Sequence, residues 1–125
     1  MPVIHLEGLP QRVSQPGMTI SFVHAHHISF VYRRLDAGVV LAEHAHRHEQ
    51  VVHVLEGTLT FTVAGDTYQL GPGDMLLIPP DIRHAAQALT PCRLLDTFYP
   101  RALTGGESIP ERAAHPAVPG TERPG

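Results

Sequence analysis

The feature that most constrains the fold of this chain is a series of short segments rich in β-branched and aromatic residues. They occupy residues 18–25, 28–38, 50–57 and 58–63, and continue through TYQL, DMLLIP, HAAQAL and CRLLDTFY. Glycine and proline separate them, and no stretch shows the 3.6-residue apolar period of an amphipathic helix. Short strands at regular spacing are typical of a β-sandwich or barrel. We therefore predict an all-β domain.

Two connections between these segments carry turn signals. Segments 50–57 and 58–63 are expected to form a hairpin around Glu56-Gly57, and AGDT at 64–67 is expected to form a tight glycine-containing turn. Both predictions assign neighbouring segments to one sheet.

The composition of the two ends divides the chain into three parts. Residues 1–17 are punctuated by three prolines and are expected to be an irregular arm, whereas residues 18–101 form the domain. Residues 102–125 are rich in proline and glycine and hold almost no large apolar side chains. Such a tail cannot bury enough surface to offset its ordering entropy, so we expect it to be mobile or to lie on the surface.

Charge, cysteine content and hydropathy exclude several classes of protein. The formal charge is −3 and there is no basic cluster, which argues against nucleic-acid binding. No apolar run approaches the roughly 20 residues of a membrane span, and no secretory signal is visible. The single cysteine, Cys92, fits a reducing compartment. We expect a cytoplasmic protein without a membrane or nucleic-acid partner. We also expect a homodimer, paired through segment 18–24 as a sheet edge.

The histidine-rich stretch GVVLAEHAHRHEQVVHVLEG, residues 38–57, indicates a metal site. In a strand, residues two apart share a face, so His44 and His46 present their imidazoles together. Gln50 keeps that parity, whereas Glu49 is one residue out of phase despite being the better donor. His84, from a second segment, supplies a third imidazole. Such a set suits one divalent ion of zinc, iron, nickel, copper or manganese.

The last predicted strand, CRLLDTFYPR, adds candidates for catalysis and substrate binding. Asp96 is flanked by apolar residues and is either a general acid or base near the metal or a structural aspartate that caps a turn. Phe98 shares its parity and is a candidate pocket wall. Arg101 and Arg34 are candidate carboxylate clamps, because a guanidinium binds carboxylates in bidentate fashion, although both also suit a plain surface role. Tyr32 shares parity with Arg34 and is expected to reach the same cavity.

The two histidine-bearing segments resemble the two sequence motifs of the cupin superfamily. The first motif is carried by Gly38, His44, His46, Gln50 and Gly57, and the second by Gly73, Pro79 and His84. Gln50 stands where most cupins have glutamate. The resemblance covers about residues 18–100 and implies a double-stranded β-helix, the cupin jelly roll. It also implies that His44, His46, Gln50 and His84 surround one metal ion.

Within the cupins, the combination HxHxHEQ, VLEG, a PGD turn, IPP before His84 and a closing DTFYPR resembles the small monocupins of the KdgF type. That resemblance implies ring opening of 4,5-unsaturated monouronates to a keto acid, a step in carbohydrate acid metabolism. Asp96 and Phe98 match the family's active-site strand, whereas Arg101 stands one residue before the family's usual arginine. We therefore predict a metal-dependent enzyme acting on a small anionic molecule. The alternatives are an iron-dependent dioxygenase and a non-catalytic cupin that binds or senses a small ligand.

Overall fold

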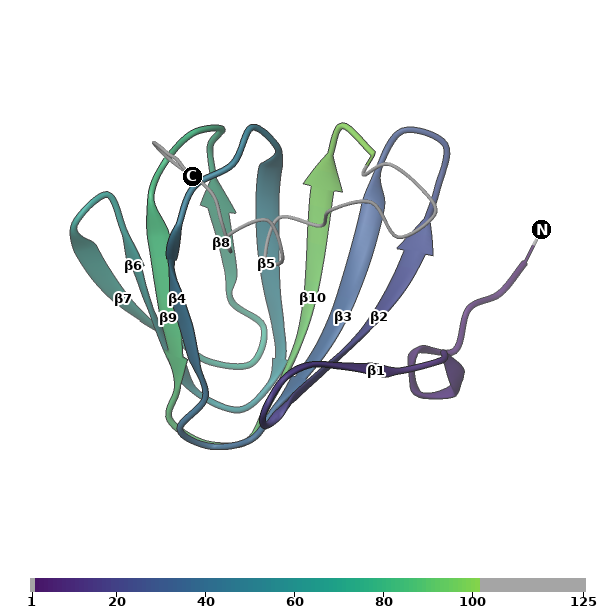
Figure 1. Ribbon diagram of the computed structural model, residues 1–125, viewed down its shortest axis with the longest axis horizontal. Coiled ribbons are helices and arrows are strands. Elements are labelled where there is room, and N and C mark those ends of the chain that lie inside the picture. The colour runs from purple at the N-terminus through teal and green to yellow at the C-terminus, as the bar shows by residue number, and fades with distance from the viewer. Residues whose placement is uncertain (1, 102–125) are drawn as a thin grey trace.

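The protein is described by a computed structural model over residues 2–101, in which two antiparallel β-sheets face each other (Figure 1). The six-stranded sheet has the order β1 (Arg12–Gln15), β2 (Met18–His24), β3 (Ser29–Leu35), β10 (Cys92–Tyr99), β5 (Glu49–Glu56) and β8 (Met75–Ile78). The four-stranded sheet has the order β4 (Val40–His44), β9 (His84–Ala88), β6 (Leu59–Val63) and β7 (Asp66–Leu70). The prediction of a single all-β domain is confirmed.

Alternating side chains build the core between the two sheets. In β10, Cys92, Leu94, Asp96 and Phe98 are buried, while the residues between them are half-buried. The apolar members pack with inward residues of both sheets, namely Val31, Val52, Val54, Leu59, Phe61, Ile78, Ala86 and Ala88. This period of two is the geometry of a strand with one face on the core. Asp96 is therefore a charged residue placed at a core position.

The connection after β5 differs from the predicted hairpin. β5 and β6 belong to different sheets, so the chain crosses the sandwich at Gly57 instead of turning back. Gly57 has φ +91°, and a Cβ on it would lie 2.2 Å from the carbonyl oxygen of Pro91. The prediction was wrong because glycine at this position serves a close approach of two backbones. By contrast, the expected turn after β6 is present: Val63 pairs with Asp66 across a two-residue loop.

The N-terminal arm is more ordered than its prolines indicate. Arg12–Gln15 forms β1, which pairs with β2 after a reversal at Gly17, where φ is +83°. β1 thus covers Met18–Ile20 of segment 18–24, so the expectation that the whole segment is a free sheet edge is wrong. The edges of this sheet are β1 and β8.

The arm also holds the one helix of residues 2–101, a 3₁₀ turn at Leu6–Gly8. Within that part of the chain, no helix is long and apolar enough to cross a membrane. The predicted tail, residues 102–125, lies outside the described residues.

Candidate metal centre

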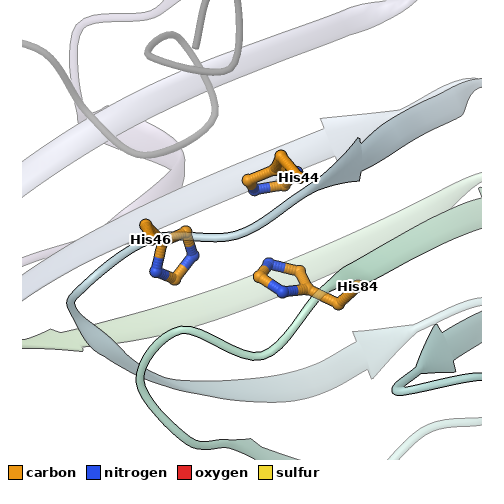
Figure 2. A group of neighbouring side chains, drawn as sticks. All are labelled: His44, His46 and His84. Carbon is orange, nitrogen blue, oxygen red and sulfur yellow. The ribbon is translucent and has the colours of Figure 1, made fainter. Parts of the chain in front are cut away.

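Three histidines meet at one end of the sandwich. His44 ends β4, His84 begins β9, and the two are register partners in the four-stranded sheet. His46 lies on the connection to β5 and turns its ring toward the other two (Figure 2). The ring centroids are 4.3 Å apart for His44 and His84, 4.9 Å for His46 and His84, and 5.4 Å for His44 and His46. One ligand nitrogen from each lies within 4.8 Å of the others, so the group can hold a metal ion.

Hydrogen bonds to the backbone set the tautomer of each ring. The three contacts are His44 Nδ1 to the Ala42 carbonyl at 3.0 Å, His46 Nδ1 to the His48 carbonyl at 3.0 Å and His84 Nδ1 to the Ile82 carbonyl at 2.9 Å. A carbonyl oxygen only accepts, so Nδ1 carries the proton in each neutral ring. Each Nε2 is then left with a lone pair, which is the arrangement of histidines that bind metals through Nε2.

Burial keeps two of these rings neutral. Desolvation lowers the pKa of His46 to about 4, and repulsion from His44 acts in the same direction. Desolvation lowers the pKa of His84 to about 3, with the neighbouring imidazoles and the Arg33 guanidinium contributing. At neutral pH both rings are therefore in the deprotonated form that a metal requires.

Gln50 brings a fourth donor from the opposite sheet. Its side chain is 4% exposed, and its Oε1 lies 3.0 Å from His46 Nε2. With the proton of His46 on Nδ1, both of these atoms carry lone pairs and no hydrogen stands between them. His84 Nε2 is likewise buried with no hydrogen-bond partner. A cation is what such a set of atoms lacks, so the residues present fit a divalent metal.

The phase of β5 decides between the two predicted oxygen donors. Glu49 is exposed, whereas Gln50 is buried beside the histidines. The structure thus brings together His44, His46, Gln50 and His84, and their role as metal ligands stays a prediction.

Asp96 lies behind Gln50 as seen from the histidines. Its Oδ2 accepts hydrogen bonds from Gln50 Nε2 at 3.0 Å and from Arg33 Nε at 2.6 Å. Asp96 and Arg33 are each 2% exposed, so they form a buried ion pair. Sequence analysis missed Arg33. The signal was its parity on β3, where Val31 and Leu35, two residues to either side, also point into the core.

Phe98 and His48 border the histidine group. The fully buried Phe98 ring lies 5.9 Å from His46 and 6.2 Å from His48, measured between ring centroids. Burial lowers the pKa of His48 as well. Arg101 follows β10 and is half-buried; the preceding Tyr99 is register partner of Glu49, so this segment lies at the histidine end of the sandwich.

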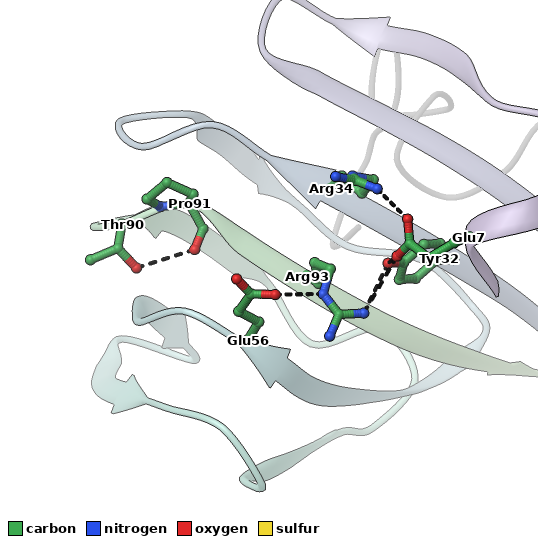
Figure 3. A network of polar contacts seen from close by, with 7 residues as sticks. All are labelled: Glu7, Tyr32, Arg34, Glu56, Thr90, Pro91 and Arg93. Carbon is green, nitrogen blue, oxygen red and sulfur yellow. Dashed lines mark hydrogen bonds and ion pairs between the residues drawn. The ribbon is translucent and has the colours of Figure 1, made fainter.

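Tyr32 and Arg34 are not in the metal centre. They alternate with the inward-pointing Arg33 and so lie on the outer face of the six-stranded sheet (Figure 3). Both donate to the carboxylate of Glu7 from the N-terminal 3₁₀ turn. The expectation that they reach the metal cavity was wrong because side chains one residue apart on a strand point to opposite faces.

Ion pairs and hydrogen bonds on the outer face of the six-stranded sheet attach the N-terminal arm to that sheet. They join Glu7, Tyr32, Arg34, Glu56 and Arg93. Arg93 donates to the Tyr32 hydroxyl at 3.0 Å and to Glu56 at 2.7 Å. The hydrogen bond from Tyr32 is the largest cause that lowers the pKa of Glu7, while desolvation, followed by that same bond, raises the pKa of Tyr32. These residues hold the N-terminal arm in place and are not part of the metal centre.

Comparison with known proteins agrees with this architecture. The family model described as "Cupin domain" matches residues 31–98. An L-ectoine synthase from Mycobacteroides abscessus is 38% identical over 93 residues, which are 73% of this chain and 71% of that protein. Among solved structures, KdgF from Halomonas sp. has a TM-score of 0.72 and 29% identity, covering 74% of this chain and 87% of its own. An RmlC-like cupin from Shewanella frigidimarina has a TM-score of 0.71 and 33% identity, covering 75% and 86%. The resemblance to small monocupins is confirmed.

Proposed function

Because this chain belongs to the cupin domain family, we propose that it is a metal-dependent enzyme acting on a small, oxygen-rich anion such as a sugar acid. The observation that carries the proposal is the convergence of donor atoms without protons. Three imidazole nitrogens and the Gln50 amide oxygen meet at one end of the sandwich, and the backbone holds the imidazole protons on the far side of each ring.

The charge of the donor set favours anionic substrates. Three neutral imidazoles and a neutral amide leave a divalent ion its full positive charge, whereas a glutamate would remove one unit. The carboxylate of Asp96 does not change this balance, because the Arg33 guanidinium pairs with it at 2.6 Å. Bound at this site, a divalent ion supplies Lewis-acid polarisation of a substrate carbonyl or enol oxygen.

The specific reaction we propose is ring opening of 4,5-unsaturated uronates. Its support is the motif set shared with the KdgF type and the likeness to Halomonas KdgF over 74% of the chain. Phe98, packed against His46 and His48, would form an apolar wall beside the sugar ring. Arg101 would bind the second anionic end of the substrate, since it follows β10 at the same end of the sandwich.

The second candidate is the reaction of the L-ectoine synthases. The observation that favours it is the 38% identity to the Mycobacteroides abscessus enzyme, which exceeds the 29% identity to KdgF. For both candidate reactions we propose the same metal centre in this chain, so that they differ in the substrate that the site accepts.

Metal analysis and two activity assays test the proposal on the purified full chain. We expect the protein to hold a stoichiometric divalent metal and to consume an unsaturated uronate, measured as a fall in the ultraviolet absorbance of the uronate. Treatment with chelator should remove both the metal and the activity. His46→Ala should lose metal and turnover. His53→Ala is the matched control, because His53 lies on the outer face of the same sheet, across from Met75 and Leu95.

Other outcomes identify the alternatives. Formation of L-ectoine, with no action on uronates, would replace the first reaction by the second. Iron with oxygen consumption would indicate a dioxygenase, and tight uronate binding without turnover would indicate a sensing cupin. Full turnover in chelated protein would refute the proposal.

We also propose a homodimer that pairs through β8. This edge strand exposes Met75 to 60% and Leu77 to 65%, and an uncovered apolar edge favours association with a second copy. Light scattering should give twice the 13.6 kDa chain mass, and Leu77→Lys should give the monomer. A wild-type monomer at high concentration would contradict this pairing.

A further inference from the structure

Three inward polar side chains form a line across the centre of the six-stranded sheet. Gln50 on β5, Asp96 on β10 and Arg33 on β3 occupy neighbouring strands, with exposures of 4%, 2% and 2%. In the register, Gln50 faces Phe98, two residues from Asp96, and Arg33 faces Leu94, two residues on the other side. The line is therefore diagonal, which is the direction in which long side chains on adjacent strands reach one another.

The contacts along this line determine which end of the Gln50 amide faces the histidines. A glutamine amide presents either an oxygen or an NH₂ group, and the two have nearly the same shape. The Asp96 carboxylate, paired with Arg33 at 2.6 Å, only accepts hydrogen bonds. The NH₂ group of Gln50 must then point to Asp96, at 3.0 Å, and the amide oxygen must point to His46.

The same contacts limit the charge that the line can hold. One guanidinium balances the charge of one carboxylate. Asp96 Oδ2, which accepts the hydrogen bond from Gln50, lies only 3.0 Å from the amide nitrogen of Gln50. A glutamate at position 50 would place a second buried carboxylate against the first, with no proton donor between them. Two like charges at that separation in a buried site repel strongly.

We propose that Asp96 and Arg33 are positioning residues that hold the Gln50 amide oxygen toward the metal, and that positions 50 and 96 together accept one carboxylate but not two. The first half rests on the proposed metal site, whereas the second half concerns the folded protein alone. This role differs from the general acid or base expected of Asp96. Asp96 Oδ2 accepts from Arg33 and from the Gln50 amide nitrogen, and it is the oxygen of that same amide that lies at His46.

The proposal predicts that the carboxylate can be moved along the line. In the double variant Gln50→Glu/Asp96→Asn the carboxylate moves from position 96 to position 50, so the total charge is kept. Arg33 and Gln50 contact the same Asp96 oxygen, Oδ2, so the introduced asparagine must turn its amide for the NH₂ group to donate to the glutamate while the amide oxygen accepts from Arg33. In Gln50→Glu alone two carboxylates meet, and in Asp96→Asn alone Arg33 loses its counter-charge and the amide of Gln50 loses its fixed direction.

The test measures thermal unfolding of chelated protein and zinc affinity for wild type, both single variants and the double variant. Each single variant should lower the melting temperature of the chelated protein by at least about 10 °C, and the double variant should return to within about 5 °C of wild type. Asp96→Asn should weaken zinc binding at least about tenfold, and the double variant should restore it, since a carboxylate presents an oxygen in either orientation. Asp66→Asn, which removes an exposed carboxylate at the start of β7, is the control for net charge.

The outcomes separate the two halves of the proposal. An Asp96→Asn protein with wild-type melting temperature and zinc affinity overturns it, and so does a double variant no more stable than the worse single variant or unable to fold. Single variants that fail to fold while the double variant folds support it. If wild-type protein binds no zinc or other divalent metal, the proposed function fails, and the chelated melting temperatures still decide whether the line accepts one carboxylate.

Discussion

Acidification of the metal-free protein should destabilise it well above the pH at which carboxyl groups titrate. The folded protein holds the pKa of His46 at about 4 and that of His84 at about 3, whereas an unfolded histidine has a pKa of about 6.5. At pH values between the folded and the unfolded pKa, the unfolded chain binds protons that the folded protein does not bind. The stability that these two histidines contribute is therefore fully present above pH 6.5, and it is lost as the pH falls toward their pKa values in the folded protein.

The size of the loss follows from the two pKa differences. At pH 5, each unfolded histidine lies about 1.5 units below its pKa, which corresponds to about 2 kcal/mol per residue. His46 and His84 together should cost about 4 kcal/mol, and the lowered pKa of His48 acts in the same direction. Such a loss is a large part of the 5–15 kcal/mol that is typical of a folded domain.

Urea unfolding of chelated protein at pH 7.5 and pH 5.0 measures this difference directly. The variant His84→Gln should be less stable at both pH values, but its loss between them should be about half that of the wild type. A wild-type protein whose free energy of unfolding is equal at the two pH values would refute the reasoning. A His84→Gln protein that keeps the full loss would show that other groups take up the protons.

Three further outcomes are expected. Gly57→Ala should cost more than about 3 kcal/mol of stability, because a Cβ would lie 2.2 Å from the Pro91 carbonyl oxygen. Gly65→Ala, with open space around the added Cβ, should cost only the roughly 1–2 kcal/mol typical of a positive φ. Comparable melting temperatures for the two variants would contradict this. Tyr32→Phe should leave metal content and turnover unchanged, since Tyr32 donates a hydrogen bond to Glu7 on the outer face of the sheet. A loss of metal in this variant would show that Tyr32 contributes to the metal centre. Chelation at pH 7.5 should lower the melting temperature, because metal binds only the folded protein, and re-addition should restore it.

The electrostatic arrangement behind the histidines also explains how a charged residue survives in the core. Asp96 and Arg33 would each be costly to bury alone, and removal of one partner leaves the other uncompensated. Their ion pair, extended to Gln50, gives both charges hydrogen bonds inside the sandwich. The stability of the core and the geometry of the metal centre thus depend on the same three side chains.

The sequence by itself determined the fold class, most strand positions and the histidine group. These follow from local patterns: the period of two in segments such as CRLLDTFY, the turn at 64–65, and the spacing of His44, His46 and Gln50. Alternation within β5 is a local property, and it buries Gln50 and exposes Glu49. The strand parity assumed to join His44, His46 and Gln50 does not hold, because His44 ends β4, His46 lies on the connection and Gln50 belongs to the other sheet. Alternation applied to β3 indicates that Tyr32 and Arg34 share a face.

Only the tertiary structure decided which face that is, and which residues from distant strands meet. Arg33 is 63 positions from Asp96 in the sequence and 2.6 Å from it in space, because β3 and β10 are neighbours in the sheet. The crossing at Gly57 and the pairing of β1 with β2 are likewise contacts between separate segments. A local pattern sets which residues share a face of a strand, but strand order and register set what each face meets, and these depend on the packing of the whole chain.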